Sequence, residues 1–168
     1  GVATRPALPG DPHRRLGFVL PSEDAATQAL QDLERLLVER HTEIAAFILE
    51  PVVQGAAGMR MYPASFLEGA RATCDRFGIH LIADEIMTGF GRTGNMFAVE
   101  HAQVRPDFMC LSKGLTGGYL PLSCVLTRDS IYAAFYDDAT SNGFLHSHSY
   151  TGSALACRAA LATLDLFV

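Results

Sequence analysis

The sequence has 168 residues, of which 49% are hydrophobic, and a formal net charge of −5 at pH 7. This length and composition suit one globular unit with a buried core. A negative chain without clusters of lysine or arginine argues against a nucleic-acid partner and an anionic membrane surface, and no apolar run reaches the roughly 18 residues of a membrane span. The four cysteines are well separated and form no Cys-x-x-Cys pair, which predicts reduced thiols in a cytoplasmic protein.

Two parts of the chain differ in pattern. Residues 1–21 contain four of the eight prolines and little hydrophobic periodicity, which predicts an extended lead-in. Residues 22–168 carry the periodic segments and are expected to form part of one domain. Because the chain begins with Gly1 in place of methionine and its last helical pattern runs to Val168, we expect a piece of a longer protein whose flanking parts are missing.

The first half of this domain alternates helices and strands. Apolar residues at helical spacing after Ser22 predict a first helix. The continuous apolar run at residues 44–49 predicts a strand that is covered on both faces, and a loop over residues 50–58 follows. A second helix is expected over residues 63–77, with a proline in its first turn and Gly78 at its C-terminal cap.

The second half continues the alternation. The expected elements are strands at residues 80–83, 108–111 and 122–127, a short helix capped by Asp129, and an alanine-rich helix after Gly152. This order predicts an α/β fold, a mostly parallel sheet with flanking helices. Glu50, Asp84 and Lys113 each follow a predicted strand, and ligands of such sheets bind at the carboxyl ends of the strands.

Lys113 is the only lysine among 13 lysine and arginine residues, and it lies in an uncharged, glycine-bounded stretch. An amine can act as a nucleophile and a proton carrier, whereas a guanidinium stays protonated. A lysine and an aspartate, Asp84, at one crevice suit pyridoxal phosphate: the lysine binds the cofactor aldehyde and the aspartate pairs with the ring nitrogen. The alternative is a structural ion pair between two strand ends.

Three other motifs give weaker predictions. Residues 89–94 match Gly-x-Gly-x-x-Gly, but they do not begin at the end of a strand, so a structural turn is favoured over dinucleotide binding. Residues 81–85 resemble the apolar Asp-Glu strand of ATPases, yet the chain has no phosphate-binding Gly-x-x-x-x-Gly-Lys motif. His146 and His148 lack further zinc ligands at usable spacing, so no metal site is predicted. Ser149, near the start of the last helix, is placed to hold a phosphate.

Residues 84–94 together with Ser112-Lys113-Gly114 resemble the signature of class III pyridoxal-phosphate-dependent aminotransferases, and the resemblance covers about residues 40–167. Similar segments at 48–55, 58–62, 110–118 and 146–152 extend it toward one member of the family. The resemblance implies the large, pyridoxal-phosphate-binding domain of fold-type I enzymes, present here in part over residues 22–168. It also implies transamination of small-molecule substrates by the complete enzyme, and we expect the 168-residue segment alone to be inactive.

The resemblance also implies roles for single residues. Lys113 is the catalytic residue and binds cofactor and substrate in turn, while Asp84 binds the cofactor ring. Ser147, where glycine is usual, falls at a substrate contact, and His148 and Ser149 at the cofactor phosphate of a partner subunit, so a homodimer with a shared active site is implied. Ala56 replaces the glutamate of ornithine- and GABA-type relatives, which argues against those substrates. Another ω-aminotransferase, an aminomutase, or a non-catalytic binding module remain as alternatives.

Overall fold

The computed structural model describes residues 22–167, and the predicted lead-in, residues 1–21, lies outside this range. Its centre is a four-stranded sheet with the order β1-β4-β5-β6. These strands are β1 (Ala46–Leu49), β4 (His80–Asp84), β5 (Phe108–Leu111) and β6 (Cys124–Thr127). β1, β4 and β5 are parallel, and β6 pairs with β5 in the antiparallel direction. The predicted α/β fold with a mostly parallel sheet is confirmed.

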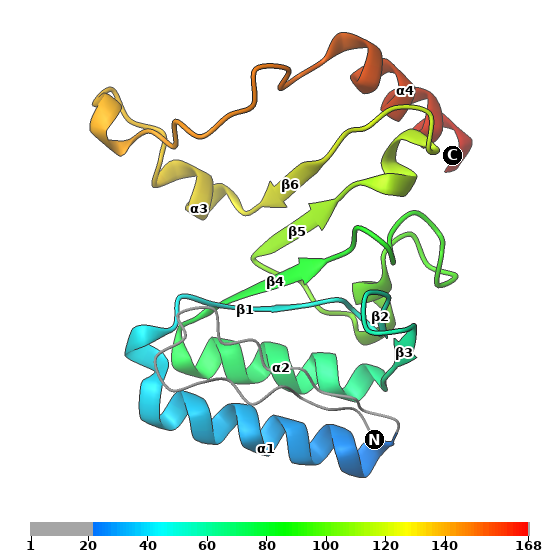
Figure 1. Ribbon diagram of the computed structural model, residues 1–168. Coiled ribbons are helices and arrows are strands. Elements are labelled where there is room, and N and C mark those ends of the chain that lie inside the picture. Colours follow the sequence, from blue (N-terminus) through cyan, green and yellow to red (C-terminus); the bar gives the residue numbers. More distant parts are fainter. Residues whose placement is uncertain (1–21, 168) are drawn as a thin grey trace.

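Two long helices, α1 (Glu23–Arg40) and α2 (Ala64–Phe77), lie on one side of the sheet. Figure 1 shows α2 between the sheet and α1. The buried core between these layers includes Leu33 and Leu37 of α1, Leu67 of α2, and Leu81 and Ala83 of β4. Burial of each of these leucine side chains contributes about 1.5–3 kcal/mol, so this core holds the two helices against the sheet.

The helix ends follow local chemistry. The Ser22 side chain accepts a hydrogen bond from the Ala25 N–H (3.2 Å), which caps α1 as predicted. Gly78 ends α2 in the left-handed conformation with a φ of 67°. Pro63 precedes α2 in extended backbone, so its prediction as a first-turn residue was wrong by one position.

Several predicted boundaries differ from the structure. β1 begins two residues late because a short 3-10 helix, η1 (His41–Glu43), ends with the Ile44 N–H bonded to the His41 carbonyl (3.1 Å). The predicted loop after β1 instead begins a hairpin, in which β2 (Val53–Gln54) pairs with β3 (Arg60–Met61). β6 also starts two residues late, and Asp129 is the first residue of α3 (Asp129–Ala133) while Arg128 occupies the cap.

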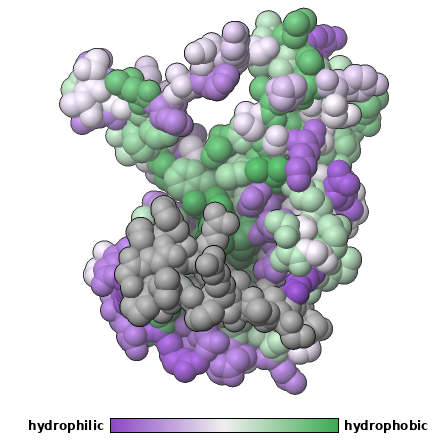
Figure 2. Space-filling view, viewed as in Figure 1, coloured by the Kyte–Doolittle hydropathy of each residue, from purple (hydrophilic) through white to green (hydrophobic). Residues whose placement is uncertain are grey.

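The chain between α3 and α4 (Ala154–Leu164) leaves the body of the molecule. We call residues 136–153 the arm; its one regular element is the 3-10 turn η4 (Thr140–Asn142). Figure 1 shows the arm in orange, and Figure 2 shows open space between it and the rest of the molecule. α4 then packs against η3 (Lys113–Thr116) and continues into η5 (Asp165–Phe167). Of the helices within residues 22–167, none is both long and apolar enough to span a membrane.

Candidate functional site

Three polar residues lie at or just after the carboxyl ends of the parallel strands, at a single edge of the sheet. Leu49 is the register partner of Ala83, and Asp84 is the partner of Cys110. Since β1, β4 and β5 run in the same direction, Glu50, Asp84 and Lys113 all lie at the edge formed by the carboxyl ends of the strands. This is the edge at which open α/β sheets bind ligands.

Asp84 is the last residue of β4, and its side chain lies on the side of the sheet opposite α2. Leu81 and Ala83, which alternate with it, are buried on the α2 side. The Asp84 Oδ1 accepts a hydrogen bond from the Ile86 N–H (3.1 Å), which fixes the carboxylate above the turn that follows. Burial and then the negative charge of Asp84 raise the pKa of the Cys110 thiol on the neighbouring strand. Asp84 is thus a fixed, partly buried carboxylate at the edge.

Lys113 begins η3, two residues after β5, and its side chain is exposed. Within residues 22–167 its amine forms neither an ion pair nor a side-chain hydrogen bond, and Asp84 does not pair with it. The alternative of a structural ion pair between these two strand ends is therefore wrong. Because a cation at a ligand-binding edge without a protein partner is available to a ligand, the arrangement favours a binding role.

Glu85 is completely buried and organises the glycine-rich turn after β4. Its carboxylate accepts hydrogen bonds from the Thr88 hydroxyl and from the Val99 N–H (2.8 Å). Within the turn, the N–H groups of Phe90 and Gly91 both point to the Met96 carbonyl (2.7 and 3.3 Å). These amides are used inside the protein and not left for a phosphate, so the Gly-x-Gly-x-x-Gly match is a structural turn, as the sequence favoured.

The hairpin β2–β3 is fastened to the same edge through Glu50. The Glu50 Oε2 accepts the Gly55 N–H (2.8 Å), and its backbone carbonyl accepts the hydroxyl of Tyr62 (2.5 Å). Burial is the main cause that raises the pKa of the Tyr62 hydroxyl, so Tyr62 stays a neutral donor. Met87 covers Gly55 so closely that a Cβ there would lie 2.9 Å from the Met87 Cε. Glu50 and Met87 thus pack together around Gly55 at the edge that carries Asp84.

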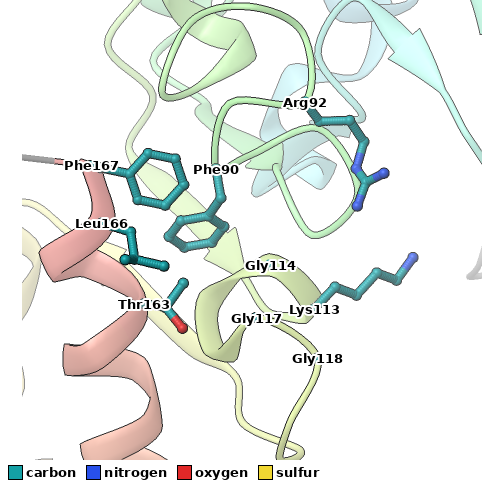
Figure 3. Close-up of a pocket in the computed structure, with 9 residues that line it drawn as sticks. All are labelled: Phe90, Arg92, Lys113, Gly114, Gly117, Gly118, Thr163, Leu166 and Phe167. Atoms are coloured by element: carbon teal, nitrogen blue, oxygen red, sulfur yellow. The ribbon is translucent and has the colours of Figure 1, made fainter.

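A pocket of about 560 Å³ adjoins Lys113 between the glycine-rich turn, η3 and the end of the chain. Its lining residues are Phe90, Arg92, Lys113, Gly114, Gly117, Gly118, Thr163, Leu166 and Phe167. Figure 3 shows two sides of this region: the rings of Phe90 and Phe167 gather on one, while the side chains of Arg92 and Lys113 extend together on the other. Sequence patterns alone do not place Arg92 and Lys113 in one pocket, because 20 intervening residues separate them along the chain.

The remaining predicted site residues lie on the arm. His146, Ser147, His148 and Ser149 are all exposed. The His148 N–H donates to the Thr151 hydroxyl (3.0 Å), and the Tyr150 N–H donates to the His148 Nδ1 (3.1 Å), so this stretch forms a compact turn before α4. The structure brings Asp84 and Lys113 to one edge of the sheet, whereas the predicted roles of Ser147, His148 and Ser149 remain predictions. Over residues 22–167, no three histidine, cysteine, aspartate or glutamate residues are grouped in a way that could hold a metal ion.

Comparison with known proteins adds the family. The model of the class III aminotransferases matches residues 9–168. The chain is 56% identical over 156 residues to the adenosylmethionine-8-amino-7-oxononanoate aminotransferase of Helicobacter pylori, covering 92% of this chain and 36% of the relative.

Two solved structures have the same fold. The enzyme of that name from Methanocaldococcus jannaschii superposes with a TM-score of 0.78 at 43% identity, over 82% of this chain and 33% of that one. An amine transaminase from an uncultivated Pseudomonas species, solved in its PLP-bound form, gives 0.79 at 41% identity, over 85% and 32% of the two chains.

The chain thus spans about a third of the length of the curated relatives it matches. Its structural neighbours are pyridoxal-phosphate-dependent aminotransferases of fold-type I, as the resemblance implied. The matched family model covers nearly all of the sequence and includes both Asp84 and Lys113. The chain belongs to the class III aminotransferases.

Proposed function

We propose that the protein of which this chain forms part is a pyridoxal-phosphate-dependent aminotransferase of biotin synthesis. It converts 8-amino-7-oxononanoate to 7,8-diaminononanoate, with S-adenosylmethionine as the amino donor. The choice of substrates rests on relatives at 46–56% identity that carry the name adenosylmethionine-8-amino-7-oxononanoate aminotransferase.

The observation that carries the proposal is the placement of Asp84 and Lys113. Asp84 ends β4 and Lys113 follows the neighbouring parallel strand β5 at the same edge, yet the two do not form an ion pair with each other. A carboxylate that is held by the Ile86 N–H and an unpaired amine leave room for a ligand that needs both. These residues fit pyridoxal phosphate, whose ring nitrogen pairs with a carboxylate and whose aldehyde reacts with an amine.

When bound, the cofactor supplies an electron-withdrawing ring that takes up the electrons released at the substrate carbon. The protein's own residues supply position and proton transfer. Asp84 would lie next to the ring nitrogen, where a carboxylate favours the protonated form of the ring. The Lys113 amine would hold the cofactor, and the same amine, when free, would move a proton at the substrate carbon.

The arm supports a homodimer with shared active sites. Four of its large apolar side chains, Tyr136, Phe144, Leu145 and Tyr150, are each more than two thirds exposed, which is typical of a segment that is buried against another surface. In the proposed dimer each arm supplies His148 and Ser149 to the cofactor phosphate of the other subunit, and Ser147 contacts the substrate. Residues 22–168 then form part of the cofactor-binding domain of a cytoplasmic enzyme.

The test is an assay of the full-length protein with S-adenosylmethionine and 8-amino-7-oxononanoate. We expect the wild-type protein to form diaminononanoate and both Lys113→Ala and Lys113→Arg to lose this activity. Arginine keeps the positive charge but cannot bind the aldehyde. Activity with other ω-amines and none with the oxononanoate would replace the proposed substrates with those of another ω-aminotransferase or an aminomutase. A full-length protein that binds no pyridoxal phosphate would instead be a non-catalytic module.

A further inference from the structure

Two residues of the site region have unusual backbone conformations. Lys113 has a φ of 46° and Phe90 a φ of 60°. Residues with a Cβ rarely adopt the left-handed region, and those that do are held there by their surroundings, often at functional sites. In this structure the two residues are neighbours through Gly114, which directly follows Lys113.

The side chain of Phe90 packs closely against Gly114. A Cβ on Gly114 would lie 3.0 Å from the Cβ of Phe90, 3.1 Å from its Cδ2 and 3.3 Å from its Cγ. Gly114 itself is not in the left-handed region. Glycine at position 114 is therefore favoured by the approach of Phe90, which a Cβ would press against, and not by its own backbone conformation.

Phe90 is itself fixed from several directions. Its N–H donates to the Met96 carbonyl (2.7 Å), and its ring contacts Phe97 edge-on with 5.7 Å between ring centres. The ring of Phe167 covers another side at 6.4 Å. Phe90 is thus a firm wall on which the start of η3 rests, and Figure 3 shows the Lys113 side chain leaving η3 away from the rings.

We infer that Phe90 is a positioning residue for the Lys113 amine. By packing on Gly114 it keeps the Lys113 backbone in the left-handed conformation, which directs the side chain to the edge that carries Asp84. This inference rests on the proposed function, because it assigns Phe90 to the lysine that fixes the cofactor. If the Phe90 side chain is removed, the Lys113 backbone can relax out of the left-handed conformation, and the Lys113 side chain then points in another direction. Attachment of the cofactor to Lys113 and proton transfer both need the amine in place. They are therefore reduced more than binding of the cofactor through other groups.

The test uses three variants of the full-length protein. Phe90→Gly removes the wall and adds no strain, because glycine tolerates a φ of 60°. Phe90→Leu retains the Cβ, Cγ and one Cδ atom, the types of atom that contact Gly114. Phe167→Leu is the matched control, because it removes a ring from Phe90 on a side other than Gly114.

Each protein is equilibrated with pyridoxal phosphate and measured in two ways. Equilibrium dialysis gives the total cofactor bound, and borohydride reduction followed by peptide mass spectrometry gives the share attached to Lys113. Phe90→Gly is expected to lower the attached share at least fivefold, with total binding within twofold of wild type. Its kcat should fall tenfold or more with KM within threefold, while Phe90→Leu and Phe167→Leu stay within twofold throughout.

The inference is overturned, and the proposed function left intact, if Phe90→Gly has the same share of cofactor attached to Lys113 as the wild type. The same holds if Phe167→Leu lowers this share as much as Phe90→Gly does. A wild-type protein without label on Lys113 overturns both. Gly114→Ala gives an independent test that also serves if Phe90→Gly does not fold. In the wild-type background, Gly114→Ala should lower the share of cofactor attached to Lys113. In the Phe90→Gly background, where Phe90 no longer packs on position 114, adding Gly114→Ala should not lower this share further. Gly114→Ala with the wild-type share attached also overturns the inference, as do equal effects of Gly114→Ala in both backgrounds.

Discussion

Asp107 offers the sharpest test of the packing beneath the site. It lies just before β5, at the end of the sheet opposite Asp84, and is almost completely buried. Its Oδ2 accepts the Leu81 N–H and an N–H of Arg71, both at 2.7 Å, and Arg128 lies 3.3 Å from Oδ1. One carboxylate therefore ties β4, α2 and the segment after β6 together. We predict that Asp107→Asn destabilises the protein without changing the residues of the site.

The magnitude follows from what the amide retains. An asparagine oxygen still accepts the Leu81 N–H, but the negative charge opposite the largely buried Arg71 is lost. Breaking a buried ion pair costs about 3–5 kcal/mol. Because Arg71 also pairs with Asp75 at 2.7 Å and keeps that partner, we expect a loss near the lower limit, about 3 kcal/mol in the free energy of unfolding.

The effect also has a defined pH dependence. Burial opposes ionisation of Asp107, but the Leu81 N–H and the Arg71 guanidinium outweigh it and lower the pKa of its carboxyl. A carboxyl whose pKa is lower in the folded state stabilises the protein above its unfolded pKa, about 3.9, and this contribution is lost as the pH falls through the folded pKa. The difference between wild type and Asp107→Asn should therefore be constant from pH 7 to about pH 5 and shrink below about pH 4.

The assay is urea unfolding of the full-length protein at several pH values. Asp75→Asn is the matched control, since it removes a carboxylate from the same arginine but at an exposed position, where a pair contributes about 0–1 kcal/mol. If Asp107→Asn is no less stable than Asp75→Asn at pH 7, the Asp107 carboxylate does not hold these three segments together. A difference from wild type that persists undiminished at pH 3 would lead to the same conclusion.

Three further predictions concern the site. Glu85→Gln turns an amide N–H toward one of two buried donors, so the unfolding free energy should drop by about 2 kcal/mol in urea titration; an unchanged value contradicts the anchoring role. Asp84→Asn should fold normally but lower kcat by orders of magnitude in a steady-state assay, since each ~1.4 kcal/mol of lost transition-state stabilisation costs tenfold; near wild-type turnover removes the role. Ser149→Ala should weaken cofactor affinity by about 1 kcal/mol, and it should weaken the dimer only when cofactor is present. Sedimentation at graded protein concentrations measures dimer dissociation. Equal dissociation of the dimer with and without cofactor would argue against a shared site.

The sequence predicted the regular elements well where local chemistry sets them. Ser22 and Gly78 mark helix ends because capping depends on a few neighbouring residues. The hairpin β2–β3 was not predicted, because each of its strands has only two residues and is held by Glu50 and Tyr62 more than by a repeating pattern. Local periodicity carries no information on such short pairings.

The residues that organise the site from a distance were also missed. Asp107 bonds to groups 26 and 36 positions away, and Glu85 reaches Val99, 14 positions on. Phe90 lay in a turn that the sequence identified as structural, and only the fold brings it against Gly114. Its position between two glycines was the one available signal. Asp84 and Lys113 could be predicted from the sequence because the carboxyl ends of parallel strands meet at one edge of the sheet, whatever the details of packing.

A crystal structure of the full-length protein with pyridoxal phosphate tests the central claim most directly. Continuous density from the Lys113 side chain to the cofactor is expected, with the ring nitrogen within about 2.6–3.2 Å of the Asp84 carboxylate. A cofactor joined to a different lysine, or a ring nitrogen that faces a group other than Asp84, would contradict the assignment of both residues.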